Sequence, residues 1–169
     1  IIHKKKGEVK LFTRRLENVS KQFPEVVEYI NKYLKGDSFI IDSEAVGFNS
    51  KTKRYQPFQN ISQRIRRKYD IEELQKKLPV EVNVFDILYH NGKSTMEKPF
   101  KERTALLRKI ITEKPYKIIS SKQIITDDEK KAKEFGEPTE DLADIASFDN
   151  SEAEEDESEE DEEDAAETG

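Results

Sequence analysis

A β-strand is predicted by the segment Ser38-Phe39-Ile40-Ile41-Asp42-Ser43-Glu44-Ala45-Val46-Gly47-Phe48, in which two apolar runs enclose a polar centre. Because successive side chains of a strand point to opposite faces, Asp42 and Glu44 share one face. A carboxylate among apolar neighbours is costly unless it is paired or binds a ligand. The pair therefore predicts either a site for hydroxyl groups or a metal ion, or an ordinary exposed strand face.

The segments on both sides of this strand predict a mixture of strands and helices. An N-terminal hairpin is expected over residues 1–13, because apolar runs flank the turn-forming residues 4–8. From Asn18 to Leu34 apolar residues recur every three or four positions, which indicates a helix with Ser20 as a candidate cap. Further helices are expected at residues 58–68, 70–78, 100–112 and 127–135, further strands at 80–89 and 118–125, and a turn at 90–93. This order favours the α+β class, with mixed or antiparallel sheets and flanking helices.

The charge of the chain is divided unevenly along its 169 residues. Residues 1–126 hold 27 Lys and Arg against 15 Asp and Glu, whereas residues 127–169 hold 3 against 21. Residues 151–169 contain 12 acidic residues, no basic residue and no large apolar one, so they cannot bury enough surface to offset the entropy lost on ordering. We therefore expect a basic domain over residues 1–126, a linker with room for a short helix over 127–150, and a disordered acidic tail over 151–169.

Composition argues against several classes of site and partner. The chain contains no cysteine, which removes disulfides and cysteine-based metal or catalytic sites and fits a reducing compartment. Its two histidines, His3 and His90, stand alone, so no zinc site is expected. No apolar run reaches the roughly 18 residues that a membrane helix needs, so no membrane partner is expected. The positive excess of residues 1–126 points instead to a polyanion, most simply nucleic acid.

Three other groups of residues are candidates for function. Arg14 and Arg15 follow a predicted strand, where guanidinium groups bind phosphate or ribose oxygens, or form a plain surface pair. Phe85 belongs to the predicted strand 80–89 and is either core packing or a platform on which a base stacks, while the adjacent Asp86 suits an arginine partner. The last group is a basic cluster that either contacts phosphates or ends a solvated helix. Its members are Arg64, Arg66, Arg67 and Lys68.

Taken together, these segments resemble the adenylation (nucleotidyltransferase) domain of ATP-dependent DNA ligases of the archaeal and eukaryotic type. The resemblance is carried, in this order, by Leu11-Phe12-Thr13-Arg14-Arg15-Leu16-Glu17-Asn18, Asp42-Ser43-Glu44-Ala45-Val46, Pro57-Phe58-Gln59, Val84-Phe85-Asp86-Ile87-Leu88-Tyr89-His90-Asn91-Gly92 and Lys98-Pro99-Phe100-Lys101-Glu102-Arg103. It spans residues 1–126 and leaves out the acidic tail. The fold that it implies is the central part of an ATP-grasp-like nucleotidyltransferase domain.

The resemblance implies an enzyme that seals nicks in double-stranded DNA during replication, repair and recombination, with ATP and Mg²⁺ as cofactors. In that reaction a lysine forms lysyl-AMP, AMP passes to the 5′-phosphate of a nick, and the 3′-hydroxyl displaces it, while Mg²⁺ neutralises developing phosphate charge. By position, Arg14 matches the arginine that contacts the nucleotide, Glu44 the carboxylate at the ribose, and Phe85 the aromatic that stacks on adenine. Glu44 is also a candidate metal ligand, and the basic cluster is a candidate DNA contact.

The chain lacks the family's nucleophile. That lysine belongs to a Lys-x-Asp-Gly-x-Arg motif just before the first hairpin, and neither this motif nor the downstream Glu-Gly-x-x-x-Lys motif occurs here. We therefore expect a fragment that binds the nucleotide, contains no catalytic residue, and needs the remainder of the ligase, in cis or in trans, for catalysis. The alternative is a non-catalytic nucleic-acid-binding relic of the fold, whose acidic tail binds an unidentified partner. Either protein is expected in the cell interior, cytoplasmic in a prokaryote or nuclear in a eukaryote.

Overall fold

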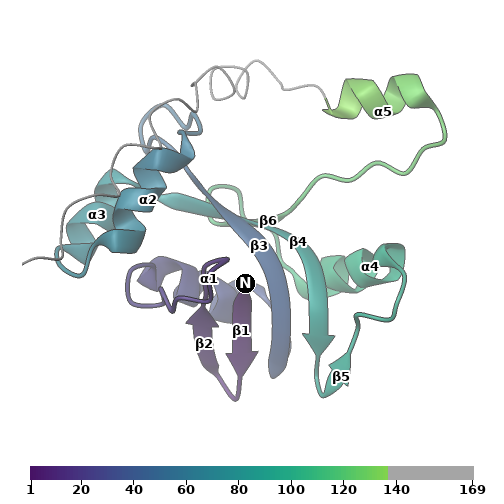
Figure 1. Cartoon of the computed structure of the whole chain (residues 1–169), viewed down its shortest axis with the longest axis horizontal. Helices are drawn as coiled ribbons and strands as arrows, with labels where there is room; N and C mark the ends of the chain where they lie inside the picture. The colour runs from purple at the N-terminus through teal and green to yellow at the C-terminus, as the bar shows by residue number, and fades with distance from the viewer. Residues whose placement is uncertain (137–169) are drawn as a thin grey trace, which may run out of the picture.

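The computed structural model describes residues 1–136, which form one six-stranded sheet and five helices (Figure 1). The expected linker beyond residue 136 and the expected disordered tail over 151–169 lie outside these residues. The strands are β1 (Ile2–Lys5), β2 (Glu8–Leu11), β3 (Ser38–Gly47), β4 (Val80–His90), β5 (Lys93–Ser94) and β6 (Ile118–Ser120). The helices are α1 (Pro24–Tyr33), α2 (Phe58–Arg66), α3 (Ile71–Lys77), α4 (Phe100–Ile110) and α5 (Glu129–Gly136).

The sheet is organised around the long antiparallel pair β3 and β4 (Figure 1). The hairpin of β1 and β2 extends the sheet on the β3 side, so that β2 is its edge. On the other side β5 pairs with the end of β4, and β6 joins β4 in parallel. The sheet is therefore mixed and mainly antiparallel, which confirms the predicted α+β class.

The turn between β4 and β5 follows directly from the local sequence. Asn91 and Gly92 both have positive φ, 44° and 89°, which two-residue hairpin turns of the primed types require and which Asn-Gly adopts readily. The Asn91 side-chain oxygen also accepts hydrogen bonds from the backbone nitrogens of Asp37 and Ser38, at 3.1 and 3.3 Å. The predicted turn at residues 90–93 is thus confirmed, and it also holds the start of β3.

Helices α1 and α4 cover the sheet and build the core with it. Their ends lie side by side, because Lys35 N donates to Ile110 O (2.8 Å) and Thr112 N donates to Tyr33 O (2.7 Å). The apolar residues that recur at helical spacing are buried or partly buried against the sheet. Core members include Val26 and Ile30 of α1, Phe39 and Ile41 of β3, Val82, Val84 and Ile87 of β4, and Leu107 of α4. Burial of each such side chain stabilises the fold by about 1.5–3 kcal/mol relative to exposure.

The first helix begins later than the periodicity predicts. It starts at Pro24, with Phe23 at the capping position and no side-chain cap. Ser20, the candidate cap, instead accepts a hydrogen bond from Leu11 N (2.9 Å) and donates one to the Asn18 side chain (2.7 Å). The prediction of a cap at Ser20 was therefore wrong: the residue ties the loop to the edge strand β2, whose backbone needs partners.

Two C-terminal predictions have different outcomes. The short helix expected at residues 127–135 is confirmed as α5. The strand expected over residues 118–125 is shorter and ends at Ser120, because β4 offers parallel partners only from Val82 to Val84. None of the helices within residues 1–136 is long and apolar enough to cross a membrane.

Candidate functional site

Arg14 is presented by a tight loop that follows β2. Thr13 N donates to Glu17 O (3.0 Å) and Leu16 N donates to Thr13 O (3.0 Å), so the chain folds back on itself. Phe12 and Asn18 close the base of the loop as an isolated antiparallel bridge. The Arg14 side chain is exposed at the tip, which leaves its guanidinium available to an anionic ligand.

Glu44 lies on β3, opposite Asn83 of β4. Its side chain is exposed, whereas Asp42, two residues earlier, is half-buried and accepts a hydrogen bond from Ser43 N (3.0 Å). The strand therefore carries two carboxylates with different surroundings. Glu44 is the one that remains free to accept hydrogen bonds from a ligand.

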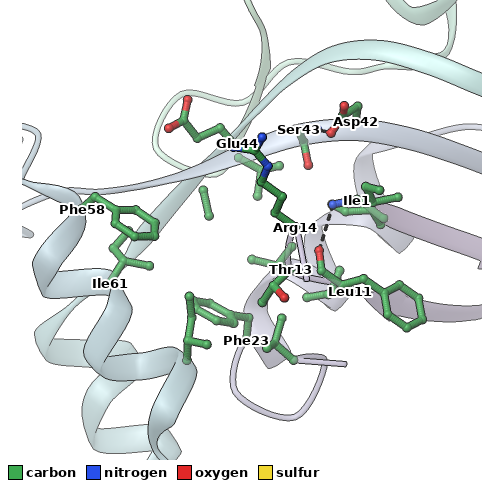
Figure 2. A pocket seen from close by; sticks show the side chains of 17 residues that line it. Ile1, Leu11, Thr13, Arg14, Phe23, Asp42, Ser43, Glu44, Phe58 and Ile61 are labelled. Atoms are coloured by element: carbon green, nitrogen blue, oxygen red, sulfur yellow. Dashed lines mark hydrogen bonds between the residues drawn. The ribbon is translucent and has the colours of Figure 1, made fainter. Parts of the chain in front are cut away.

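Arg14 and Glu44 line the same cavity, of about 650 Å³, between β3, the loop after β2, and helix α2. Figure 2 shows the Arg14 side chain extending from its loop toward Ser43 and Glu44, while Phe58 and Ile61 of α2 border the cavity from another side. The floor is apolar, and the polar groups stand at one rim. Such a cavity fits a ligand with a flat apolar part and a polar or charged part.

Phe85 does not line this cavity. The register of β3 and β4 shifts between Asp42 and Ser43, and this bulge leaves Phe85 without a direct cross-strand partner. Its ring is 38% exposed and borders a smaller cavity of about 120 Å³ together with Phe100. Phe85 comes two residues after Asn83, the partner of Glu44, with the bulge between them. Of the three predicted nucleotide contacts, two share one cavity and the third is on the adjacent strand.

The backbone beside Phe85 is held by an ion pair. Arg103 of α4 donates from Nε and Nη2 to the two carboxylate oxygens of Asp86, at 2.8 and 2.9 Å. The hydrogen bond that Arg103 donates to Asp86 is the main cause that raises the pKa of Arg103. The predicted arginine partner of Asp86 is therefore present, and it anchors α4 to the strand that carries Phe85.

Arg64 contradicts the prediction that it belongs to a surface cluster for DNA. Its side chain is completely buried and forms an ion pair with Glu25, with Nη1 to Oε1 at 2.5 Å. A side chain without exposed surface cannot contact a phosphate. Arg66, Arg67 and Lys68 of the same cluster are exposed, so the structure separates Arg64 from its neighbours.

The sequence did not predict that two lysines, Lys10 and Lys21, line the same groove as part of this basic cluster. Arg67 and Lys68 line a groove of about 600 Å³, and Lys10 and Lys21 line the same groove. Lys10 belongs to the edge strand, and Lys21 to the loop before α1. The only sequence signal was the general positive excess of residues 1–126, because the four side chains meet only after the chain folds.

A metal ion would find few protein ligands in the described part of the chain. Within residues 1–136 no three His, Asp or Glu side chains are grouped closely enough to hold one. Asp42 and Glu44 line the large cavity, which provides two carboxylates. Mg²⁺ is commonly bound by one or two carboxylates together with substrate phosphates, so these residues fit such an ion only alongside a phosphorylated ligand.

Comparisons with known proteins agree on one family. The family model described as "ATP dependent DNA ligase domain" matches residues 1–141. A DNA ligase of Nanoarchaeum equitans is 52% identical over 134 residues, covering 79% of this chain and 24% of that protein. A DNA ligase of Methanococcus aeolicus is 44% identical over 136 residues, covering 80% of this chain and 24% of that protein.

A solved structure, a mycobacterial DNA ligase D complexed with ATP and MES, is similar with a TM-score of 0.45 and 22% identity. The similarity covers 64% of this chain and 32% of that chain. The chain thus spans about a quarter of the length of the curated relatives named above.

Proposed function

Because this chain belongs to the family of ATP-dependent DNA ligase domains, we propose that it forms the nucleotide-binding part of a ligase adenylation domain. The observation that supports this most is the shared cavity of Arg14 and Glu44, with its apolar floor and polar rim. The ribose hydroxyls and charged phosphates of a nucleotide match the polar side chains of this cavity, and the base then extends from it toward Phe85 on the adjacent strand β4.

Each of the three residues has a role that suits its chemistry. Glu44 accepts hydrogen bonds from the ribose hydroxyls, because its exposed carboxylate offers two acceptor oxygens. Arg14 binds phosphate or ribose oxygens through its fork of N–H donors. Phe85 stacks on the adenine, which requires the exposed ring and a stable strand beneath it. The ion pair of Asp86 and Arg103 supplies that stability.

We propose that the complete ligase seals nicks in double-stranded DNA through lysyl-AMP. The lysine nitrogen bonds to the α-phosphorus and loses its proton, and the bond to pyrophosphate breaks with its electron pair. Mg²⁺, held by phosphates with Glu44 and Asp42 as carboxylate ligands, would neutralise charge that develops on the phosphates. This chain contains no Lys-x-Asp-Gly-x-Arg motif, so on its own it binds the nucleotide without forming the covalent intermediate.

The proposal is tested by calorimetric titration of the chain with ATP and Mg²⁺. Phe85→Ala should weaken ATP binding about tenfold, since stacking of a base on an aromatic ring contributes about 1–3 kcal/mol. Glu44→Gln should weaken binding of ATP more than that of a dideoxy analogue without ribose hydroxyls. The matched control is Phe135→Ala, which removes a half-exposed aromatic of α5 that lines neither cavity.

Two outcomes would contradict the proposal. Equal ATP affinity of Phe85→Ala and the unchanged chain would favour the non-catalytic relic that binds only nucleic acid. Covalent transfer of label from α-labelled ATP onto the chain, stable to denaturation, would show that the chain adenylates itself without the family motif.

A further inference from the structure

A basic groove lies between the β2 edge of the sheet and the connection from α2 to α3. It is the cavity of about 600 Å³ whose walls carry Lys10 and Lys21 on one side and Arg67 and Lys68 on the other. All four side chains are exposed. Figure 1 shows α2 and α3 beside the hairpin of β1 and β2, with this groove where the two parts meet.

Three of the four cations lack a compensating carboxylate in the described part of the chain. Glu8 is the acidic residue among those that line the groove, and its carboxylate lies 3.2 Å from the Lys10 ammonium. The other ion pairs within residues 1–136 involve none of the remaining three cations. Asp70, two residues after Lys68, is not part of the lining. The groove therefore keeps a net positive charge, which attracts an anionic partner.

The two walls of the groove are joined by buried and half-buried hydrogen bonds. Arg64 Nη2 donates to Gln22 O (2.7 Å), and the Gln22 side chain donates to Ile65 O (3.2 Å). These bonds connect the loop that carries Lys21 with the end of α2, which leads into Arg67. The cations are thus spaced before any partner arrives, so that less ordering entropy opposes binding.

The same chain contains a segment with the complementary charge. Residues 151–169 contain 12 acidic residues, no basic residue and no large apolar one. Such a segment has no apolar side chain to place in a core or in an apolar cavity, so charge is the property through which it binds a surface. The lining of the groove suits it, because it has no aromatic ring and no free carboxylate.

The chain that follows the described residues is long enough to reach the groove. These residues end at Gly136, and 22 further residues lead to Ser158 in the middle of the acidic segment. A length of 22 residues spans at most about 75 Å, whereas a domain of this size has a radius of gyration of about 14 Å. Because both partners belong to one chain, their effective concentration is of millimolar order, so that even a weak contact is populated.

We propose that the acidic segment 151–169 binds in the basic groove of its own chain, with its carboxylates against the cations of both walls. The groove shares no lining residue with the cavity of Arg14 and Glu44, so this contact leaves that cavity open. The inference goes beyond the proposed function and does not depend on it. Any other polyanion that approaches this face has to displace the segment, which makes the segment a built-in competitor.

The test places a nitroxide spin label at Ser158→Cys in the full 169-residue chain, which has no other cysteine. The label broadens the NMR signals of nearby backbone amides, and the chemically reduced label gives the reference spectrum. The groove variant combines Lys21→Gln, Arg67→Gln and Lys68→Gln. The control variant combines Lys93→Gln, Lys101→Gln and Lys109→Gln, which removes the same charge at exposed positions outside the groove. Circular dichroism confirms that both variants are folded.

In the unchanged chain at low salt, the amides of residues 21, 67 and 68 should be broadened, and those of residues 93, 101 and 109 should not. The broadening should disappear at about 1 M salt, where charges are screened beyond roughly 3 Å. In the groove variant it should fall at least about fivefold, because the surface ion pairs that hold the segment are lost. The control variant should keep the broadening of the unchanged chain.

Three outcomes would overturn the inference. Equal loss of broadening in the two variants would attribute the contact to net charge alone. Absence of broadening in the unchanged chain would show that the segment does not bind the groove. The third outcome comes from a mixture of spin-labelled chain with isotope-labelled chain that carries no spin label. Equal broadening in that mixture would show that the segment binds the groove of a second copy.

Discussion

Arg64 and Glu25 form a buried ion pair that joins α2 to α1. The two guanidinium nitrogens Nη1 and Nη2 lie 2.5 and 3.0 Å from the two carboxylate oxygens. Arg64 also donates to Leu78 O and Gln22 O, and its guanidinium carbon lies 4.3 Å from the centre of the Phe23 ring. An arginine near the end of a basic helix is thus part of the interior, where it joins α2 to α1 and to the loop before α1.

Arg64→Gln should be strongly destabilising. Removal of one partner leaves the Glu25 carboxylate buried without compensation, which costs about 3–5 kcal/mol. Urea denaturation followed by circular dichroism measures this loss. The control Arg66→Gln changes an exposed residue of the same helix and should alter the free energy of unfolding by no more than about 0.5 kcal/mol. Similar losses in the two variants would show that the ion pair is not the cause.

The pair of Asp86 and Arg103 should act on nucleotide affinity through Phe85. Arg103→Lys keeps the charge but loses the two-point hydrogen bonding, so it should weaken ATP binding several-fold while the chain stays folded. A double-mutant cycle combines Arg103→Lys with Asp86→Asn and gives the coupling in the free energy of unfolding. This coupling should exceed the one measured for the exposed pair Glu73 and Lys77 on α3. Calorimetry and urea denaturation supply the two measurements. A coupling no larger than that of the α3 pair would contradict a positioning role.

Asn91 should contribute to stability through both its backbone and its side chain. Asn91→Ala places an unfavourable residue at positive φ and removes the bonds to Asp37 N and Ser38 N, for an expected loss of about 1–2 kcal/mol. Asn91→Gly keeps the left-handed backbone and removes only the side-chain bonds, so its loss should be smaller. Thermal unfolding of the two variants ranks the effects. A larger loss for glycine would show that backbone strain is unimportant at this turn.

Stability should decline in strongly alkaline solution because of Tyr29. Burial, followed by the carboxylates of Glu25 and Glu28, raises the pKa of Tyr29 to about 12. Since the folded state holds this proton more tightly than the unfolded state, whose tyrosine pKa is about 10, the contribution is fully present below pH 10 and is lost as the pH rises toward 12. Tyr29→Phe should therefore flatten the fall of unfolding free energy above pH 10, and should remove one late step from the ultraviolet titration of tyrosinate. An unchanged titration curve would contradict the raised pKa.

Local patterns predicted most of the elements correctly because the information lies within a few residues. The apolar runs of residues 38–48, the Asn-Gly turn and the apolar spacing of residues 100–112 are each satisfied by the short-range geometry of strand, turn or helix. The isolated Asp86 in an apolar strand likewise indicated an arginine partner, which is Arg103. The element ends were less well predicted, because Ser20 and Ser120 depend on where the neighbouring strands offer hydrogen bonds.

Local sequence patterns could not predict which of the neighbouring basic residues is buried and which is exposed. Arg64 and Arg67 stand three positions apart at one helix end, yet Arg64 is buried against Glu25, 39 residues away in the chain, and Arg67 lines a groove with Lys21. Residue type and spacing suffice for most of the secondary structure and for the family resemblance, whereas the nucleotide roles of Arg14, Glu44 and Phe85 stay predictions. Which of these charges are neutralised inside and which face a partner depends on how α1, α2 and the edge strand pack, because an ion pair between distant residues, such as Arg64 and Glu25, forms only where tertiary contacts bring them together.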